Sequence, residues 1–296
     1  MSVPAYYPYR SLAVRDEYFA HYDSLAARDW PVVSEERMVP TSGGATFVRI
    51  SGPSGAPPLV LLPGAGATSL MWAPNVRSLS QAYRTFAVDQ MGELGRSTCT
   101  QPVRNLDDLV RWLDELFDGL ELSGGINLAG LSYGGALTAQ YALRFPKRLR
   151  KAILLAPGAT VLRLGAGFVI HLVLAAVASR RGLPLLFRWL FEDMIRKDPA
   201  WLDATLKEIF ILMHELQRRK TPIPPVISDA EWGGLSVPTL FLVGEHEKIY
   251  SARKAVERLK RVAPQVRSTI VPGAGHDLTF VQADVVNRLI IEFLDG

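Results

Sequence analysis

The sequence has very few of the residues that build disulfides and metal centres. Its one cysteine, Cys99, excludes an intrachain disulfide and a cysteine-based zinc site. The segment that starts at His246 reads H-E-K-I-Y and not the H-E-x-x-H of zinc hydrolases, and neither a G-x-x-x-x-G-K-[ST] nor a G-x-G-x-x-G loop occurs. We therefore expect no metal, no nucleotide cofactor, and a reducing compartment such as the cytoplasm.

Charge of one sign and long apolar runs are also scarce. Thirty-three Lys and Arg residues against 29 Asp and Glu residues give a formal net charge of +4, which is too small an excess for a dedicated nucleic-acid binder. The first residues lack the apolar centre of a secretory signal. The most apolar stretch, 164–178, is shorter than the roughly 20 residues of a spanning helix and contains His171. We expect a buried or half-buried helix there and no stable membrane insertion.

Hydrophobic residues form 48% of the 296-residue chain, which is enough to bury a large core. Apolar β-type runs alternate with helical patterns, and several runs are uninterrupted, as in strands covered on both faces. This alternation predicts an α/β fold with a mostly parallel central sheet flanked by helices. The expected strands are 46–50, 59–62, 85–88, 126–129, 152–155, 239–243 and 268–271, and the expected helices include 16–28, 105–120, 136–145 and 284–294.

The alternation stops between residues 157 and 228, which we name the cap segment. It contains helical and proline-rich stretches, with one helix expected near 201–219, and no convincing strand. We expect an all-helical cap inserted over the strand ends, where open α/β sheets bind ligands. The predicted core is then 1–156, with a helical N-terminal arm at 1–30, and 229–296.

The segment Ile126 to Gly135 carries the strongest catalytic pattern. It reads I-N-L-A-G-L-S-Y-G-G, in which a buried strand runs into Gly-x-Ser-x-Gly and then into a helix. This is the context of a nucleophile elbow, whose tight turn holds the serine in strained geometry at a helix N-terminus. We predict that Ser132 is a nucleophile; the alternative is a plain glycine-rich turn.

A serine nucleophile needs a base, and the base needs an orienting carboxylate. Among only five histidines, His276 follows the last expected strand in V-P-G-A-G-H-D-L and can reach Ser132 from a strand end; the alternative is a capping or surface histidine. The acid is expected in G-E-H-E-K-I-Y after 239–243, where Glu247 is favoured and Glu245 is its rival. The order Ser, Glu, His is that of α/β-hydrolases.

Acyl transfer also needs at least two N–H donors for the oxyanion. One is the amide of Tyr133, directly after the elbow serine. The other is expected in the loop P-G-A-G-A after strand 59–62, where Ala65 lies between two glycines that let the backbone approach a substrate. The alternative for this loop is a flexible turn.

These motifs together resemble the serine carboxylesterases of the α/β-hydrolase superfamily, in particular capped bacterial esterases. The resemblance runs along nearly the whole chain, through L-L-P-G-A-G, V-D-Q-M-G-E-L-G-R-S, A-G-L-S-Y-G-G, L-V-G-E-H-E and G-A-G-H. It implies the α/β-hydrolase fold, a structural role for Asp89 in loop organisation, and these site residues: Ser132 as nucleophile, Glu247 as acid, His276 as base, and Ala65 and Tyr133 as oxyanion donors. The family's usual His-Gly is here Pro63-Gly64, which main-chain donors tolerate.

We therefore expect a metal-free carboxylic-ester hydrolase that works through an acyl-enzyme. The apolar and aromatic cap segment favours small to medium, largely apolar esters. A lactone or carbon–carbon bond hydrolase with the same triad is one alternative, and a non-catalytic ligand sensor on the same scaffold is another. The expected partner is a small-molecule ester and no nucleic acid, and a homodimer is left open.

Overall fold

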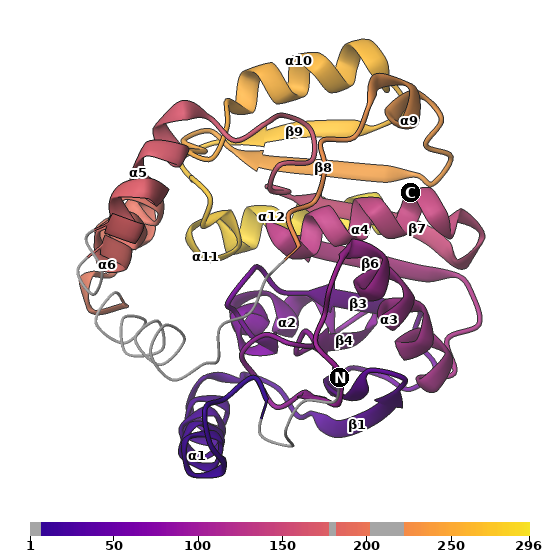
Figure 1. Cartoon of the computed structure of the whole chain (residues 1–296). Helices are drawn as coiled ribbons and strands as arrows, with labels where there is room; N and C mark the ends of the chain where they lie inside the picture. The colour runs from indigo at the N-terminus through magenta and orange to yellow at the C-terminus, as the bar shows by residue number, and fades with distance from the viewer. Residues whose placement is uncertain (1–6, 178–181, 202–221) are drawn as a thin grey trace.

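A computed structural model of the chain describes residues 7–177, 182–201 and 222–296 (Figure 1). Its centre is a nine-stranded sheet in the order β1-β2-β4-β3-β6-β7-β8-β9, with β5 paired to β2. Pairs that include β2 are antiparallel, and every pair from β4 across to β9 is parallel. The strands are β1 (Glu35–Thr41), β2 (Gly44–Ser51), β3 (Pro58–Leu62), β4 (Arg84–Val88), β5 (Thr98–Cys99), β6 (Ile126–Leu131), β7 (Leu149–Leu155), β8 (Thr239–Gly244) and β9 (Arg267–Val271).

Helices cover both faces of the sheet, which confirms the predicted α/β-hydrolase architecture. In β3, Leu59 and Leu61 pack on the side of α2 and α12, whereas Val60 and Leu62 pack on the side of α3, α4 and α10. Burial on both faces explains why the parallel strands are uninterrupted apolar runs. The helices of the core are α1 (Leu12–Asp29), η1 (Ser69–Trp72), α2 (Ala73–Leu79), α3 (Leu106–Gly119), α4 (Tyr133–Arg144), η2 (Pro146–Arg148), α9 (Asp229–Gly233), α10 (Ala252–Val262), α11 (Leu278–Val281) and α12 (Ala283–Asp295).

Every expected strand lies inside an observed one, but β1 and β5 were not expected. β1 reads E-E-R-M-V-P-T, and Val39 is its one buried residue. It is an edge strand that tolerates a proline and charged side chains, so it has no apolar run to reveal it. β5 is two residues long. Among the helices, α3 begins after Asn105, whose side chain accepts a hydrogen bond from the Asp108 amide at 2.9 Å, as an N-cap does.

The cap segment connects β7 to β8 through helices. Its described residues form α5 (Ala166–Val177), α6 (Gly182–Leu190) and α7 (Glu192–Lys197), and they contain no strand. In Figure 1, α5 and α6 stand beyond the arrowheads of β8 and β9, at the carboxyl ends of the strands. The helix expected near 201–219 lies almost wholly outside the described residues. No helix in the described ranges is both long and apolar enough to span a bilayer.

The sheet order reverses beside β3, because the chain passes from β3 to β4 on one side and then to β6 on the other. Ligands of open α/β sheets bind at such a switch point, outside the carboxyl ends of the strands. The loops after β3, β6, β8 and β9 all begin at this edge. These loops carry all of the predicted site residues.

Gly130 at the end of β6 tests how tightly the elbow is packed. A Cβ placed on Gly130 would lie 2.2 Å from the carbonyl carbon and oxygen of Gly134, so the backbone must move to accept Gly130→Ala. We expect this variant to lower the free energy of unfolding by at least about 2 kcal/mol. Urea denaturation followed by circular dichroism measures the loss.

Gly167→Ala is the matched control, because a Cβ placed on Gly167 in α5 meets nothing within 4 Å. In a helix this change is expected to be neutral or stabilising by about 0.5–1 kcal/mol. Equal unfolding midpoints for the two variants would contradict the packing described for the elbow.

Candidate active site

Ser132 stands at the turn between β6 and α4. Its backbone angles are φ 53° and ψ −111°, a conformation that costs energy for any residue with a side chain. The turn is held on both sides, because the Ser132 amide donates to the Leu155 carbonyl at 2.8 Å and the Gly158 amide donates to the Ser132 carbonyl at 3.1 Å. The end of β7 therefore fixes the strained serine in place.

Close backbone contact joins this turn to the loop after β3. A Cβ placed on Gly134 would lie 2.5 Å from the Pro63 carbonyl oxygen, and one on Gly64 would lie 3.5 Å from the Ser132 Cβ. Glycine at position 134 lets the loop after β3 lie directly against the start of α4, whereas a side chain at position 64 would meet Ser132 only in ordinary contact. Ala65 and Tyr133 are the residues that follow Gly64 and Ser132 in these two adjoining segments.

His276 and Glu247 meet because the loops after β8 and β9 run side by side. The His246 amide donates to the Ala274 carbonyl at 2.9 Å, and a Cβ on Gly244 would lie 2.2 Å from the Gly275 carbonyl oxygen. The Glu247 carboxylate then lies 2.8 Å from Nδ1 of His276, with both side chains almost completely buried.

The structure distinguishes the two glutamates of G-E-H-E-K-I-Y. The second carboxylate oxygen of Glu247 accepts from the Ile249 amide at 2.8 Å, so neither oxygen is free to turn away. Glu245 is exposed and accepts from the Gly273 amide at 3.1 Å. Glu247 is therefore the carboxylate that contacts His276.

The environment of His276 favours the charged imidazolium. Burial lowers the pKa of His276, but the charge and hydrogen bond of Glu247, with the charge of Asp277, outweigh burial and raise this pKa above its ordinary value. Burial and the charge of Glu247 also raise the pKa of Tyr250 well above its ordinary value, so this phenol stays neutral. The pair can thus stabilise a proton that is transferred to His276.

The backbone amides of Ala65 and Tyr133 are available to a ligand. In the described part of the chain, neither amide donates to a protein acceptor. The neighbours of Ala65 are occupied, since the Gly64 amide lies 3.4 Å from the Met71 sulfur and the Gly66 amide lies 3.1 Å from a Glu93 carboxylate oxygen. An oxyanion requires at least two such donors, so these two amides stay the candidates for that role.

Asp89 organises the loops behind this site, in keeping with its expected role. Its fully buried carboxylate accepts from the Ser69 amide at 2.7 Å and from the Arg96 amide at 2.8 Å. Burial raises the pKa of Asp89, and these hydrogen bonds oppose that shift. Tyr22 of α1 reaches the same point and shares a 2.8 Å hydrogen bond with the Ser69 hydroxyl. The N-terminal arm thus packs against the end of the loop that carries Ala65.

The Ser132 hydroxyl and His276 are not hydrogen-bonded in the described part of the chain. The hydroxyl faces Gly158, on which a Cβ would lie 3.8 Å from Oγ. Contacts of this kind are often long in unliganded enzymes and shorten when a substrate binds. The structure thus shows the contact of His276 with Glu247, while Ser132 stands on a loop that begins at the same edge of the sheet and has no direct bond to His276 in the described part of the chain.

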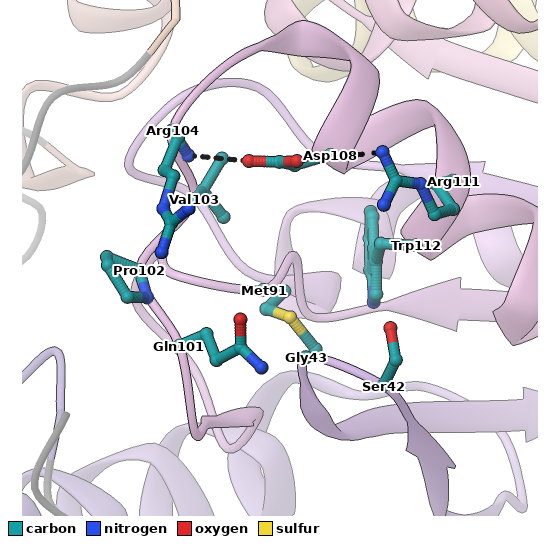
Figure 2. Close-up of a pocket in the computed structure, with 10 residues that line it drawn as sticks. All are labelled: Ser42, Gly43, Met91, Gln101, Pro102, Val103, Arg104, Asp108, Arg111 and Trp112. Carbon is teal, nitrogen blue, oxygen red and sulfur yellow. Dashed lines mark hydrogen bonds and ion pairs between the residues drawn. The ribbon is translucent and has the colours of Figure 1, made fainter. Parts of the chain in front are cut away.

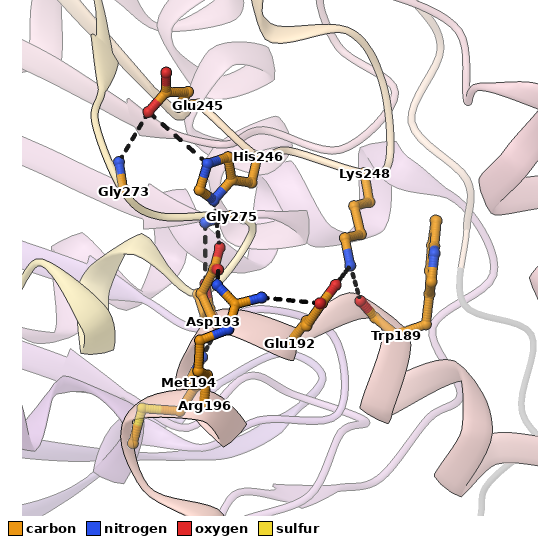
Figure 3. Close-up of polar contacts among 11 residues, drawn as sticks. Trp189, Glu192, Asp193, Met194, Arg196, Glu245, His246, Lys248, Gly273 and Gly275 are labelled. Atoms are coloured by element: carbon orange, nitrogen blue, oxygen red, sulfur yellow. Dashed lines mark hydrogen bonds and ion pairs between the residues drawn. The ribbon is translucent and has the colours of Figure 1, made fainter.

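Helix α7 of the cap segment contacts both the loop after β8 and the loop after β9, as Figure 3 shows. Asp193 lies 2.9 Å from Nδ1 of His246, and Glu192 lies 2.6 Å from the Lys248 ammonium. The Met194 amide donates to the Asp277 carboxylate at 2.8 Å, directly beside His276. Sequence analysis missed these contacts because nothing in the spacing of α7 shows which loop it meets.

A surface cavity of about 190 Å³ lies away from these residues. Figure 2 shows that it is lined by the β1–β2 turn, by Met91 from the loop after β4, and by Arg104 and Trp112 from the loop before α3 and from α3 itself. It contains none of the predicted site residues. Within the described ranges, no group of three or more His, Cys, Asp or Glu side chains could hold a metal ion.

The parallel sheet, the elbow after β6 and the buried His–Glu pair define the class of α/β hydrolases. The chain belongs to the alpha/beta hydrolase family, whose model matches residues 59–289. It is 31% identical to the carboxylesterase YbfK of Bacillus subtilis over 94% of this chain and 93% of that one. It is 32% identical to an uncharacterized carboxylesterase, nap, of the same organism, over 94% and 92% of the two chains. The crystal structure of naproxen esterase from Bacillus subtilis covers 96% of this chain and 99% of its own, with 30% identity and a TM-score of 0.87.

The contact between Glu247 and His276 makes a prediction about proton affinity. Glu247→Gln removes the charge that raises the pKa of His276 and leaves the burial that lowers it. We expect the pKa of this imidazole to fall in the variant, as measured by an NMR titration of the ring. The neutral form of His276 is then reached at a lower pH than in the unmodified protein.

Glu245→Gln is the control, since Glu245 contacts Gly273 and not His276. It should leave the titration of His276 where it is in the unmodified protein. A His276 pKa that stays the same or rises in Glu247→Gln would show that this carboxylate does not stabilise the imidazolium.

Proposed function

We propose that the protein is a serine hydrolase that cleaves carboxylic esters with a Ser132–His276–Glu247 triad. The observation that carries this proposal is the buried 2.8 Å contact between His276 and Glu247, on loops that open at the same sheet edge as the strained Ser132 turn. Similarity to the Bacillus carboxylesterases, at 31% and 32% identity over 94% of this chain, supports the ester bond as the target.

In the proposed reaction, His276 takes the proton of the Ser132 hydroxyl as the oxygen attacks the acyl carbon. The negative charge that develops on the carbonyl oxygen is stabilised by the amides of Ala65 and Tyr133. His276 then gives its proton to the leaving alcohol, and water hydrolyses the acyl-enzyme by the same steps. Glu247 holds the imidazole in the required orientation and stabilises its charged form.

The substrate is proposed to be a small to medium, largely apolar ester. The ring of Phe191 lies 6.4 Å from that of His276, and Trp201 lies 5.5 Å from Phe191 and 6.0 Å from Phe280. This row of rings places an aromatic wall from the cap segment beside the base. Such a wall favours an apolar group over a charged one.

Lactone hydrolysis and carbon–carbon bond hydrolysis use the same triad chemistry and stay as the alternative activities. A panel of p-nitrophenyl esters, lactones and vinylogous diketones separates the three reactions by their relative kcat/KM. The ligand-sensor alternative predicts no turnover of any of them. The cytoplasmic location, the small-molecule partner and the homodimer also stay predictions.

Replacing the elbow serine tests the proposal directly. Ser132→Ala should lower kcat for p-nitrophenyl butyrate by about 10⁴-fold or more, because the nucleophile is lost while the fold is kept. It should also abolish labelling by a fluorophosphonate probe. A spectrophotometric assay of p-nitrophenol release measures kcat, and intact-protein mass spectrometry measures the labelling.

Ser54→Ala provides the control, because Ser54 lies on an exposed loop between β2 and β3. Both its turnover and its labelling should match those of the unmodified protein. Ester turnover that persists in Ser132→Ala would remove the proposed function.

A further inference from the structure

We propose that Glu93 is a positioning residue. It fixes the conformation of the loop after β3, which carries Ala65, by accepting a hydrogen bond from the Gly66 amide. Glu93 lies in the loop that follows β4, four residues after Asp89, and its own amide donates to the Gln90 carbonyl at 3.2 Å. The side chain is almost completely buried, with 4% of its surface exposed. A carboxylate in such a place is costly unless its oxygens accept hydrogen bonds. One of them accepts from Gly66 at 3.1 Å.

The segment that Glu93 holds is a four-residue turn with Ala65 at its second position. The Ala67 amide donates to the Gly64 carbonyl at 3.1 Å, and Gly66 at the third position has φ +71°. A closed turn with positive φ at that position is a type II turn. Types I and II differ by a flip of the peptide between the second and third residues, here Ala65 and Gly66. The flip decides whether the Gly66 N–H or the Ala65 carbonyl points toward Glu93.

The carboxylate selects one of these two arrangements. An N–H that points at Glu93 gains a charge-assisted hydrogen bond, whereas a carbonyl oxygen that points at it is repelled. The Gly66 amide is the group that meets Glu93. Glu93 therefore holds the turn in its type II form, which fixes the path of the backbone directly after the Ala65 amide.

The charge of Glu93 also acts on the Tyr133 side chain. Burial and then the charge of Glu93 raise the pKa of the Tyr133 phenol above its ordinary value. The phenol donates to the Pro222 carbonyl at 2.8 Å.

The inference rests on the proposed function and is tested by substitutions at Glu93. Glu93→Ala removes the acceptor, so kcat for p-nitrophenyl butyrate should fall by about 10- to 100-fold, with KM changed by less than about threefold. Glu93→Gln keeps an oxygen acceptor of the same reach but loses the charge, so it should retain more of kcat than Glu93→Ala and less than the unmodified protein. Glu93→Asp keeps the charge but shortens the side chain, so it should lose kcat as Ala does.

Glu115→Ala is the matched control. Glu115 also holds a turn through a backbone amide, that of Ser42 at 2.8 Å, but it does so on the exposed β1–β2 turn. Its loss should leave kcat unchanged. Thermal unfolding of each variant shows whether it is folded. If Glu93→Ala is unfolded, the kcat of Glu93→Gln compared with that of Glu93→Asp tests the inference.

Two results would overturn the inference: a kcat within twofold of the unmodified protein in Glu93→Ala or Glu93→Asp, or a Gln variant as impaired as these. The proposed function fails separately, if the unmodified protein hydrolyses no ester or if Ser132→Ala keeps turnover. An active enzyme that needs Ser132 but not Glu93 therefore rejects the role of Glu93 alone.

Discussion

The arrangement of the site depends on one steric constraint, the contact between the start of α4 and the end of β3. Gly134 lies so close to the Leu62 and Pro63 carbonyls that a Cβ on it would stand 2.5–2.6 Å from their oxygens. Only a residue without a side chain lets the two segments meet at this distance. Because they meet, a strained serine, its neighbouring amide and the amide of Ala65 share one small space. The loops after β8 and β9 add their side chains at the same sheet edge.

Buried carboxylates give these irregular loops their shape. In each case a carboxyl oxygen accepts a hydrogen bond from a backbone amide. Asp89, Glu93, Glu247 and Asp277 accept from the amides of Ser69, Gly66, Ile249 and Met194 respectively. Loops have no ladder of hydrogen bonds of their own, so these side chains supply the fixed points. One of the four, Glu247, also reaches the imidazole.

Much of the fold could be predicted from the sequence, because the parallel strands must be apolar on both faces. The edge strand β1 was not predicted, because one of its faces and its unpaired edge are exposed to water. For the site, the glycine pattern around Ser132 and the order of the motifs were enough to propose residues. They could not decide between Glu245 and Glu247, because that depends on how the loops after β8 and β9 pair through backbone atoms. Nor could they indicate Glu93 or α7, whose partners are distant in the chain.

Helix α7 limits how a cap segment could be exchanged between related hydrolases by design. Its residues contact the loop of Glu247 and the loop of His276 at once, through Asp193, Glu192 and the Met194 amide. A cap segment transplanted from a related hydrolase would arrive with its own α7 and would meet foreign loops. An exchange of the cap segment should therefore end before α7, near Leu190. The recipient protein then keeps its own α7 together with the two loops that this helix contacts.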